Sequence, residues 1–359
     1  MWFFYLILIV LLLEAVLIFN KGITGKSKKF YSILAFIQLS ILSAFRSINV
    51  GNDTKEYVRL FETIMRLGNI QDFYPRFEIG YLYFNKLVGY LSSNPQILLS
   101  ITSFIILGTF FWFINRNTKL IWLSTYLYIT TGIFGFALSG IRQSIAISII
   151  LISYELMKRK RLIWFIVTVF VASCFHSSAI VFILIYPLSK VKFDYKITLL
   201  LLIISILVFI NFDKFIFFGF KFFPKYFFYV DSIYFDGNIR SASIADALGN
   251  FSILMLGYFF GYLKKGPNEN SLLCYMSLIS LLILFVSLKG NLLDRFSIYF
   301  SIFNIILVTK IIEGIASKET KFLMILLVMI LTLMYSTVVM FYRPDWNRVF
   351  PYEFFWQVQ

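Results

Sequence analysis

Apolar runs of about 18 to 20 residues recur along the whole of this 359-residue sequence. A run of that length crosses the hydrocarbon core of a bilayer as one helix. Hydrophobic residues make up 60% of the chain, which is more than a soluble domain of this size uses. The pattern therefore predicts an all-α, polytopic integral membrane protein.

Short cation-rich loops separate the runs, and the positive-inside rule places such loops in the cytoplasm. They all share one side only if 162–188 crosses twice, as a hairpin interrupted by "FHSSA". The first run lacks a cationic leader and a cleavage site, so we expect a span there. This gives about twelve crossings, with both termini outside. The predicted spans are Trp2–Asn20, Phe30–Phe45, Gln96–Asn115, Leu120–Leu138, Ser139–Met157, Leu162–Leu188 (twice), Ile197–Phe212, Leu248–Leu263, Leu272–Leu288, Leu292–Ile312 and Phe322–Phe341.

The composition narrows the choice of partners. A formal net charge of +15 would suit a nucleic-acid protein, but most lysines lie in the loops between spans, so we expect no nucleic-acid partner. Cys174 and Cys274 lie in or beside apolar segments, and we infer neither a disulfide nor a metal site. We treat residues 1–359 as a single transmembrane domain without a cofactor. Glu14, inside the first span, is expected to pair within the bundle.

Two external segments follow from this topology, residues 46–95 and 213–247. In the first, Thr54–Leu67 places its apolar residues on one face, which predicts an amphipathic helix lying on the membrane. Pro75–Leu91 repeats the pattern. The second, Asp213–Ala247, is aromatic-rich and suits an interfacial lid.

The unusual polar residues gather at the external side. Cytoplasmic cations are mainly lysines, whereas the outer ones are mainly arginines, and the positive-inside rule does not ask for them. The planar guanidinium matches phosphate oxygens two at a time. We therefore predict a pocket for a lipid-linked phosphate or diphosphate. The residues are Arg46, Asp53, Glu78, Arg142, Gln143, His176, Lys289, Asp294, Arg295, Arg343 and Arg348.

Simpler structural roles remain open for several of these residues. Arg142 could extend to the outer head groups, and Asp53 could cap a helix in a capping box with Glu56. Glu78 stands near a helix start, where a carboxylate is favourable for the dipole alone. His176 could satisfy backbone groups at the hairpin tip. Arg295 could pair with the neighbouring aspartate.

Six stretches, taken in their order, span nearly the whole sequence. They are "FRSINVGNDTKEY" (Phe45–Tyr57), "RFEIGY" (Arg76–Tyr81), "GIRQSIAISI" (Gly140–Ile149), "CFHSSAIVF" (Cys174–Phe182), "DRFSIYF" (Asp294–Phe300) and "WNRVFPYEFFW" (Trp346–Trp356). Together they resemble the EpsG family, the Wzy-like polymerases of bacterial exopolysaccharide and capsule synthesis. The segment 213–247 carries none of these stretches.

The resemblance implies a glycosyltransferase of the bacterial cytoplasmic membrane with its active site toward the outside. Such an enzyme moves a growing glycan from undecaprenyl diphosphate onto a new lipid-linked repeat unit, beside flippase and chain-length regulator proteins. The sequence has no Gly-rich nucleotide loop and no Asp-x-Asp signature. We therefore expect a metal-independent reaction.

The site residues take roles in this reaction. We expect Arg142 to stabilise the leaving diphosphate, next to Gln143, with Arg46, Arg295 and Arg343 in support. As the only histidine, His176 is preferred over Asp53 and Glu78 as the base. Tyr57, Tyr81 and Tyr352 would stack on sugars.

Two other functions stay open. A flippase of lipid-linked glycans would show an internal repeat and a polar path across the membrane. A membrane acyltransferase that modifies polysaccharide would need a cytoplasmic route for its donor. We expect no polar cluster at the inner face that could provide one.

Overall fold

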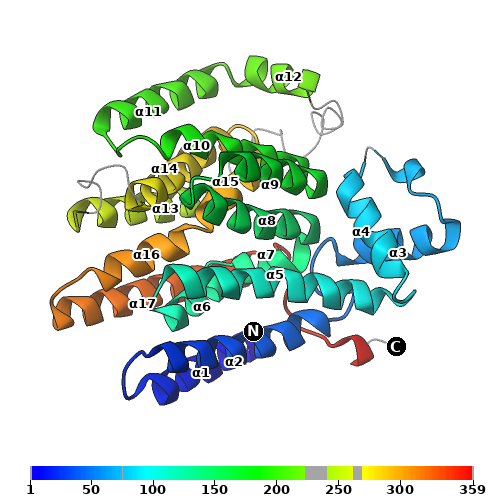
Figure 1. Cartoon of the computed structure of the whole chain (residues 1–359), viewed down its shortest axis with the longest axis horizontal. Helices are drawn as coiled ribbons and strands as arrows, with labels where there is room; N and C mark the ends of the chain where they lie inside the picture. The colour runs from blue at the N-terminus through cyan, green and yellow to red at the C-terminus, as the bar shows by residue number, and fades with distance from the viewer. Residues whose placement is uncertain (1, 75, 223–240, 262–268, 358–359) are drawn as a thin grey trace. The chain divides into compact units, whose positions relative to one another are not determined.

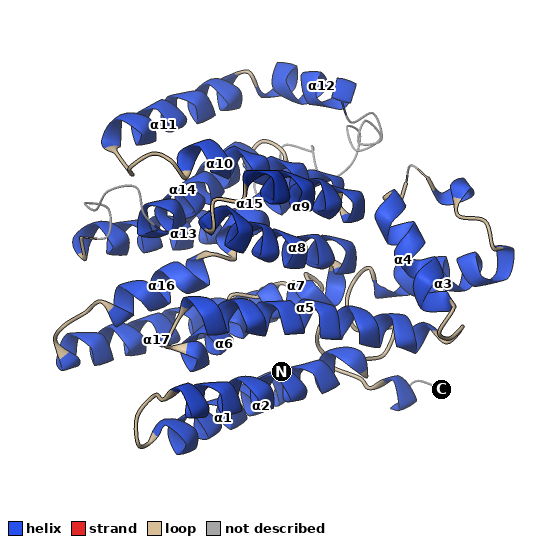
Figure 2. Ribbon diagram, viewed as in Figure 1, coloured by secondary structure: helices blue, strands red, loops and turns tan. Residues whose placement is uncertain are grey.

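The computed structural model describes residues 2–74, 76–222, 241–261 and 269–357, and there the regular structure is helical (Figure 2). The β-type pairing among these residues is one isolated bridge between Arg46 and Phe354. The all-α prediction is confirmed for the described part of the chain. Packing forms two compact units, residues 1–177 with 312–359, and residues 178–311. That the chain is a single domain stays a prediction.

Four helices of the first unit pack in a row (Figure 1). α2 (Gly25–Ala44) packs on α5 (Pro95–Asn117), α5 on α8 (Ile141–Lys158), and α8 on α9 (Leu162–Phe175). Most residues of α8 are buried. α8 is therefore the central helix of this unit, and the candidate site begins in its first turn.

Two helices of the first unit present apolar surface outward. α1 (Trp2–Phe19) and α17 (Lys318–Tyr342) bury only 22% and 11% of their most apolar stretches. Both pack on α6 (Ile121–Thr130). Gln38 of α2 donates to the carboxylate of Glu14 on α1, which confirms the expected pairing of Glu14 inside the bundle. Such exposed apolar faces are suited to contact with lipid.

Caps and glycines explain several helix ends. Thr24 and Ser27 form a reciprocal capping box at the start of α2. Asn94 accepts a backbone hydrogen bond just before α5. Gly132, in the left-handed region at φ 80°, separates α6 from α7 (Ile133–Ser139), and the two helices differ in direction by 58°.

Four described helices are long and apolar enough to cross a membrane, and up to seven spans result if each bent pair is one span. This is the structure of a membrane protein, but the predicted twelve crossings are not confirmed. α8 is not one of these four helices, and its 18 residues include the charged Arg142, Glu155 and Lys158. α9 has 14 residues, a length of about 21 Å, which is short for a full span.

The predicted amphipathic helix forms, but its apolar face contacts protein. α3 (Thr54–Leu67) has the predicted bounds, and Tyr57, Phe61 and Ile64 on its apolar face are buried. The helix packs against α4 (Ile79–Gly89) and α5. The expectation that this face lies on the membrane is therefore corrected: an amphipathic period does not distinguish lipid from a protein neighbour.

In the second unit, α14 (Glu269–Ser287) contacts α11 (Tyr195–Ile210), α13 (Ser241–Phe259) and α15 (Asp294–Ser301). α11 turns by 89° into α12 (Phe212–Phe222), which forms the first part of the predicted lid. The remainder of that segment up to residue 240 lies outside the described residues, as does the cation-rich loop "LKKG" at residues 263–266, which the loop charges predict to be cytoplasmic.

The long apolar run 162–188 breaks where predicted. α9 ends at Phe175, His176 is extended, and a 3₁₀ helix begins at the next residue. The second half of the run is thus mainly 3₁₀ and not the expected α-helix. The other short elements are the 3₁₀ helices Gln71–Phe73, Ser177–Leu184, Asn291–Leu293 and Phe355–Gln357, and the α-helices α10 (Ile185–Leu188) and α16 (Asn304–Glu313).

Candidate functional site

The candidate site begins with an ion pair at the start of α8. Arg142 lies in the first turn of α8, and its Nη1 donates to Oε2 of Glu78 at 2.5 Å. Glu78 directly precedes α4 but makes no capping hydrogen bond there. The Arg142 side chain keeps 20% of its surface exposed, against 6% for Glu78. The guanidinium is therefore held by a carboxylate and does not extend alone toward head groups, while part of the Arg142 side chain stays accessible.

The other oxygen of Glu78 binds the turn after α9. Ser177 donates its backbone N–H at 3.2 Å and its hydroxyl at 3.1 Å to Oε1 of Glu78. Arg142 and Ser177 stand 64 and 99 residues from Glu78 in sequence. The carboxylate thus joins two distant segments.

His176 directly precedes this serine and ends α9. Its backbone is extended, its N–H donates to the carbonyl of Ala172 at 3.0 Å, and its side chain is 8% exposed. His176 was predicted as a site residue from the sequence, and Ser177 was not. The polar "HSS" after an apolar run marks the position, but it does not show that Ser177 donates hydrogen bonds to Glu78.

Aromatic rings form the wall behind the guanidinium. Arg142 lies 4.8 Å from the ring centroid of Phe77 and 5.9 Å from that of Tyr57, within cation–π range. The rings of Tyr57 and Tyr81 meet edge to face at 5.5 Å. Both tyrosines are buried. In this conformation they support Arg142 and present no open face to a sugar.

A glycine lets α4 approach the end of α9. A Cβ at Gly80 would lie 2.7 Å from the carbonyl oxygen of Cys174, closer than atoms pack. The ring of Phe84 on α4 meets that of Phe175 at 6.1 Å. This contact places Glu78, two residues before the glycine, within reach of Ser177.

Asp53 lies at the start of α3, and Gln143 follows Arg142 on α8. Asp53 is at the N-cap position of α3 but makes no side-chain capping bond, and Glu56 instead pairs with Arg76 at 2.5 Å, so the capping box does not form. Next to Asp53, Asn52 donates its N–H to the Ser139 hydroxyl at 3.1 Å, just before α8. Gln143 is buried beside Arg142.

Arg46 is brought to the same unit but is fully enclosed. Its Nη1 donates to the carbonyl of Ser43 and lies 3.3 Å from the hydroxyl of Ser103. Its Nε has no hydrogen-bond partner among the described residues. Burial lowers the pKa of Arg46 to about 10, so the group stays charged at neutral pH. In this conformation its charge is not open to a ligand.

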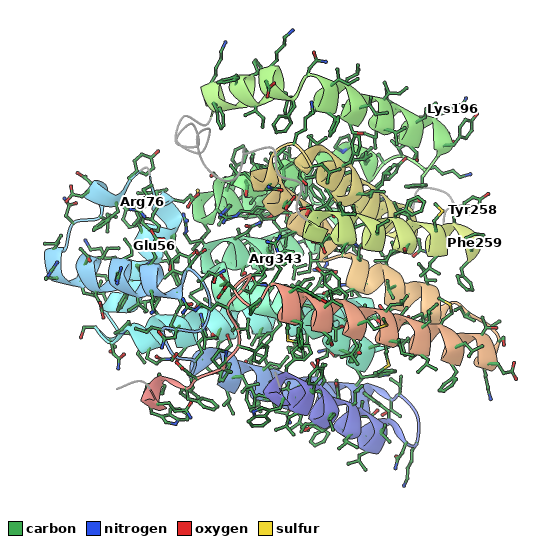
Figure 3. All side chains as sticks on the ribbon, turned by 180° about the vertical axis from the view of Figure 1, so that it is seen from behind. Glu56, Arg76, Lys196, Tyr258, Phe259 and Arg343 are labelled. Atoms are coloured by element: carbon green, nitrogen blue, oxygen red, sulfur yellow. The ribbon has the colours of Figure 1, made fainter. Side chains whose placement is uncertain are left out.

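The C-terminal tail runs beside the loop after α2. Ser47 donates its N–H to the carbonyl of Glu353 at 2.8 Å, and the Tyr352 hydroxyl donates to the carbonyl of Leu42. Arg343 lies at the end of α17 and is exposed (Figure 3). Two of the sequence stretches, "FRSINVGND" and "WNRVFPYEFFW", are therefore neighbours in space.

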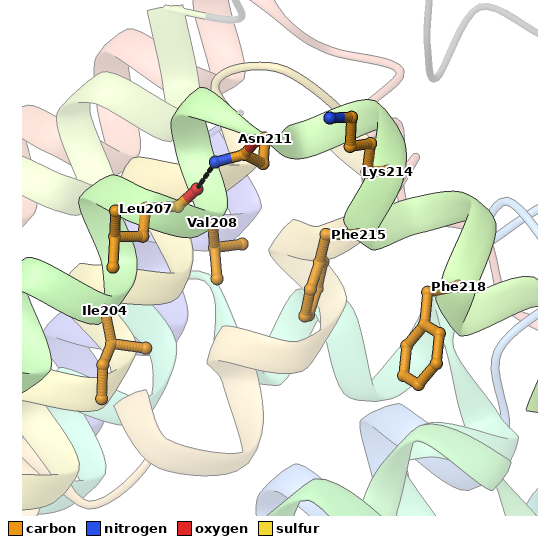
Figure 4. Close-up of a pocket in the computed structure, with 7 residues that line it drawn as sticks. All are labelled: Ile204, Leu207, Val208, Asn211, Lys214, Phe215 and Phe218. Carbon is orange, nitrogen blue, oxygen red and sulfur yellow. Dashed lines mark hydrogen bonds between the residues drawn. The ribbon is translucent and has the colours of Figure 1, made fainter.

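Arg295 belongs to the second unit, in the first turn of α15. The neighbouring Asp294 accepts a hydrogen bond from the Ser243 hydroxyl at 2.7 Å. A hollow of about 370 Å³ in the same unit lies at the bend between α11 and α12 (Figure 4). Its lining is apolar apart from Asn211 and Lys214, so it offers space without reactive groups.

A polar network closes the other end of α8. Glu155 accepts from Asn117 Nδ2 at 2.8 Å, and Lys158 Nζ donates to Asn117 Oδ1 at 2.8 Å. Arg116 lies 3.6 Å from Glu155. The expectation that this end holds no polar cluster is therefore wrong, because sequence alone did not show that the α5 and α8 ends meet. A lack of polar groups at this end of α8 therefore cannot be used to exclude an acyltransferase.

The described residues hold no group of three or more His, Cys, Asp and Glu side chains placed to bind a metal. In comparisons with known proteins, one family profile, described as the EpsG family, matches residues 29–354. No curated protein matches the chain, and no solved structure does.

Proposed function

Because this chain belongs to the EpsG family, as the match over residues 29–354 shows, we propose that it is a membrane glycosyltransferase. Family membership and the apolar helices fit a membrane polymerase or glycosyltransferase in general. The finer proposal is polymerisation of undecaprenyl-diphosphate-linked repeat units into an exopolysaccharide or capsule chain. The reaction would occur at the outer face of the bacterial cytoplasmic membrane, with flippase and chain-length proteins as partners.

One observation carries the proposal: the guanidinium of a part-exposed arginine and the turn that holds the sole histidine are tied to the same carboxylate. Arg142 and Ser177 both bind Glu78. A guanidinium can stabilise a diphosphate, and a histidine can accept a proton near neutral pH. Glycosyl transfer from a lipid diphosphate needs both functions close together.

In the proposed reaction a hydroxyl of one sugar unit attacks the anomeric carbon of the donor glycan. A glycosidic bond forms as the bond to the diphosphate oxygen breaks, and that electron pair leaves with the diphosphate. Arg142 stabilises the charge on this leaving group. His176 accepts the hydroxyl proton, with Asp53 as the second candidate. The proposal gives arginine the task that a divalent metal performs elsewhere.

The other candidate residues have weaker geometric support. Gln143 lies next to Arg142 in sequence, and Arg343 is exposed at the end of α17. Arg46 would have to be uncovered before it could bind a diphosphate. Arg295 and Tyr352 stay predictions for diphosphate and sugar binding.

Purified protein in vesicles, supplied from outside with lipid-linked repeat units, tests the function. A ladder of lengthening glycans is the expected result, and it should be absent with empty vesicles. Movement of the lipid without lengthening would instead identify a flippase. Acyl transfer without lengthening would identify an acyltransferase, for which the Glu155 network provides inner-face polar groups. Either of these outcomes overturns the proposal.

A further inference from the structure

Glu78 is bound on both of its oxygens. Oε2 accepts from the Arg142 guanidinium, and Oε1 accepts from both the N–H and the hydroxyl of Ser177. A carboxylate that accepts several hydrogen bonds, one of them charge-assisted, is stabilised as the anion. Taking up a proton would weaken its contact with Arg142.

We infer that Glu78 is a positioning residue that fixes Arg142 and the His176 turn relative to each other, and that it is not the proton acceptor. This inference rests on the proposed function and deepens it, because it separates one candidate base from the others. One oxygen of Glu78 binds Arg142, which would stabilise the leaving diphosphate. The other oxygen binds Ser177, which follows the candidate base His176 in the chain.

The surroundings of Glu78 are built to keep it in place. Phe77 and Tyr57 support the guanidinium from behind, and Gly80 brings α4 against the end of α9. Glu78 is 6% exposed. Removing one partner of a buried ion pair leaves the other charge buried and uncompensated, which is strongly destabilising.

A neighbouring ion pair provides the matched control. Glu56 and Arg76 pair at the same 2.5 Å separation, two residues from Glu78 along the chain on the arginine side (Figure 3). Their side chains are 48% and 77% exposed. An exposed pair contributes little to stability, so Glu56→Gln removes an ion pair but none of the hydrogen bonds among Arg142, Glu78 and Ser177.

The test compares kcat and KM across the pH range for the parent, Glu78→Gln, Glu78→Asp and Glu56→Gln in the vesicle assay. The glutamine keeps the shape and an acceptor for Ser177, but its amide group cannot attract the guanidinium. We expect kcat of Glu78→Gln to fall on the order of 10²-fold, because small misplacements of reacting groups have effects of that size. KM should change less. Glu78→Asp should recover part of the rate, and Glu56→Gln should match the parent.

The pH profile separates positioning from proton transfer. If Glu78 positions the site, Glu78→Gln keeps the fall in rate at low pH, since the base is still present. Loss of that acid limb in Glu78→Gln would identify Glu78 as the base and overturn the inference. Parental kcat in Glu78→Gln would overturn it as well.

A measurement without catalysis covers variants that fold poorly. Thermal unfolding of Glu78→Ala, Ser177→Ala and the double variant forms a cycle, in which each single change removes the contact and non-additive shifts report it. Additive shifts would contradict the inference. A parent protein that makes no ladder would instead remove the proposed function, and the unfolding cycle would still report the contact.

Discussion

The N–H and the hydroxyl of Ser177 both donate to one carboxylate oxygen of Glu78, at 3.2 and 3.1 Å. Ser177 follows His176 directly, so this contact fixes the backbone on which the candidate base is carried. Glu78 uses its second oxygen for Arg142. The position of the Glu78 side chain thus sets the distance between Arg142, which would stabilise the diphosphate charge, and the turn of His176, which would accept the proton.

Arg142→Ala should lower the polymerisation rate by on the order of 10²–10³-fold, by analogy with the loss of one oxyanion donor. Arg142→Lys should recover little, because an ammonium cannot replace the planar fork. The rate of ladder growth in vesicles measures both. Arg66→Ala, which removes an exposed arginine from the last turn of α3, serves as the control. Long polymer made by a folded Arg142→Ala protein at a parental rate would remove Arg142 from the mechanism.

His176→Gln should lower the rate by roughly 10²–10⁴-fold, the usual contribution of a general base. It should also abolish the fall in rate at low pH that is expected of the parent protein. Initial rates over a pH series, with protein insertion verified for each sample, give both results. A retained acid limb would move the assignment to Asp53.

Gly80→Ala should reduce both stability and rate, because its Cβ would meet the Cys174 carbonyl. Overpacking of this kind costs about 1–3 kcal/mol. Gly249→Ala is the matched control: this helical glycine has open space around it, and alanine favours a helix. Thermal unfolding should show a lower midpoint for the first variant only, and equal midpoints would disprove the close approach of α4 and α9.

Glu155→Ala should destabilise the first unit by about 1–3 kcal/mol, since Asn117 loses a buried partner. The polymerisation rate per folded molecule should stay near the parental value. Glu319→Ala, at an exposed helix start, is the comparison for unfolding and rate. A Glu155 variant with normal stability but little activity would show that the hydrogen-bond network of Glu155, Asn117 and Lys158 takes part in function.

Much of the helical layout is predictable because apolar length and loop charge are local properties. The predicted spans at 2–20, 96–115 and 322–341 coincide closely with α1, α5 and α17. The bend between α11 and α12 lies next to the predicted boundary, because Asn211, Asp213 and Lys214 interrupt the apolar run where the predicted span 197–212 ends. Burial of the α3 face by α4 and α5 escaped prediction, because the sequence period is the same against lipid and against protein.

The members of the site are partly predictable, and their pairing is not. Arginine, glutamate and histidine stand out in apolar surroundings, so Arg142, Glu78 and His176 could be selected from sequence. The bond from Ser177 to Glu78 spans 99 residues, and no local pattern encodes it. Glu78 does stand at a helix start, as the sequence indicated, but its bond to Ser177 became known only once α4 and α9 were seen to meet.

The central helix α8 is fastened at both tips, by Glu78 at its start and by Asn117 near its end. Over 18 residues, or about 27 Å, it can neither slide nor turn without losing one of these anchors. We therefore expect α8 to keep its position. Under the proposed function, any movement that a growing glycan requires has to come from the segments around this helix.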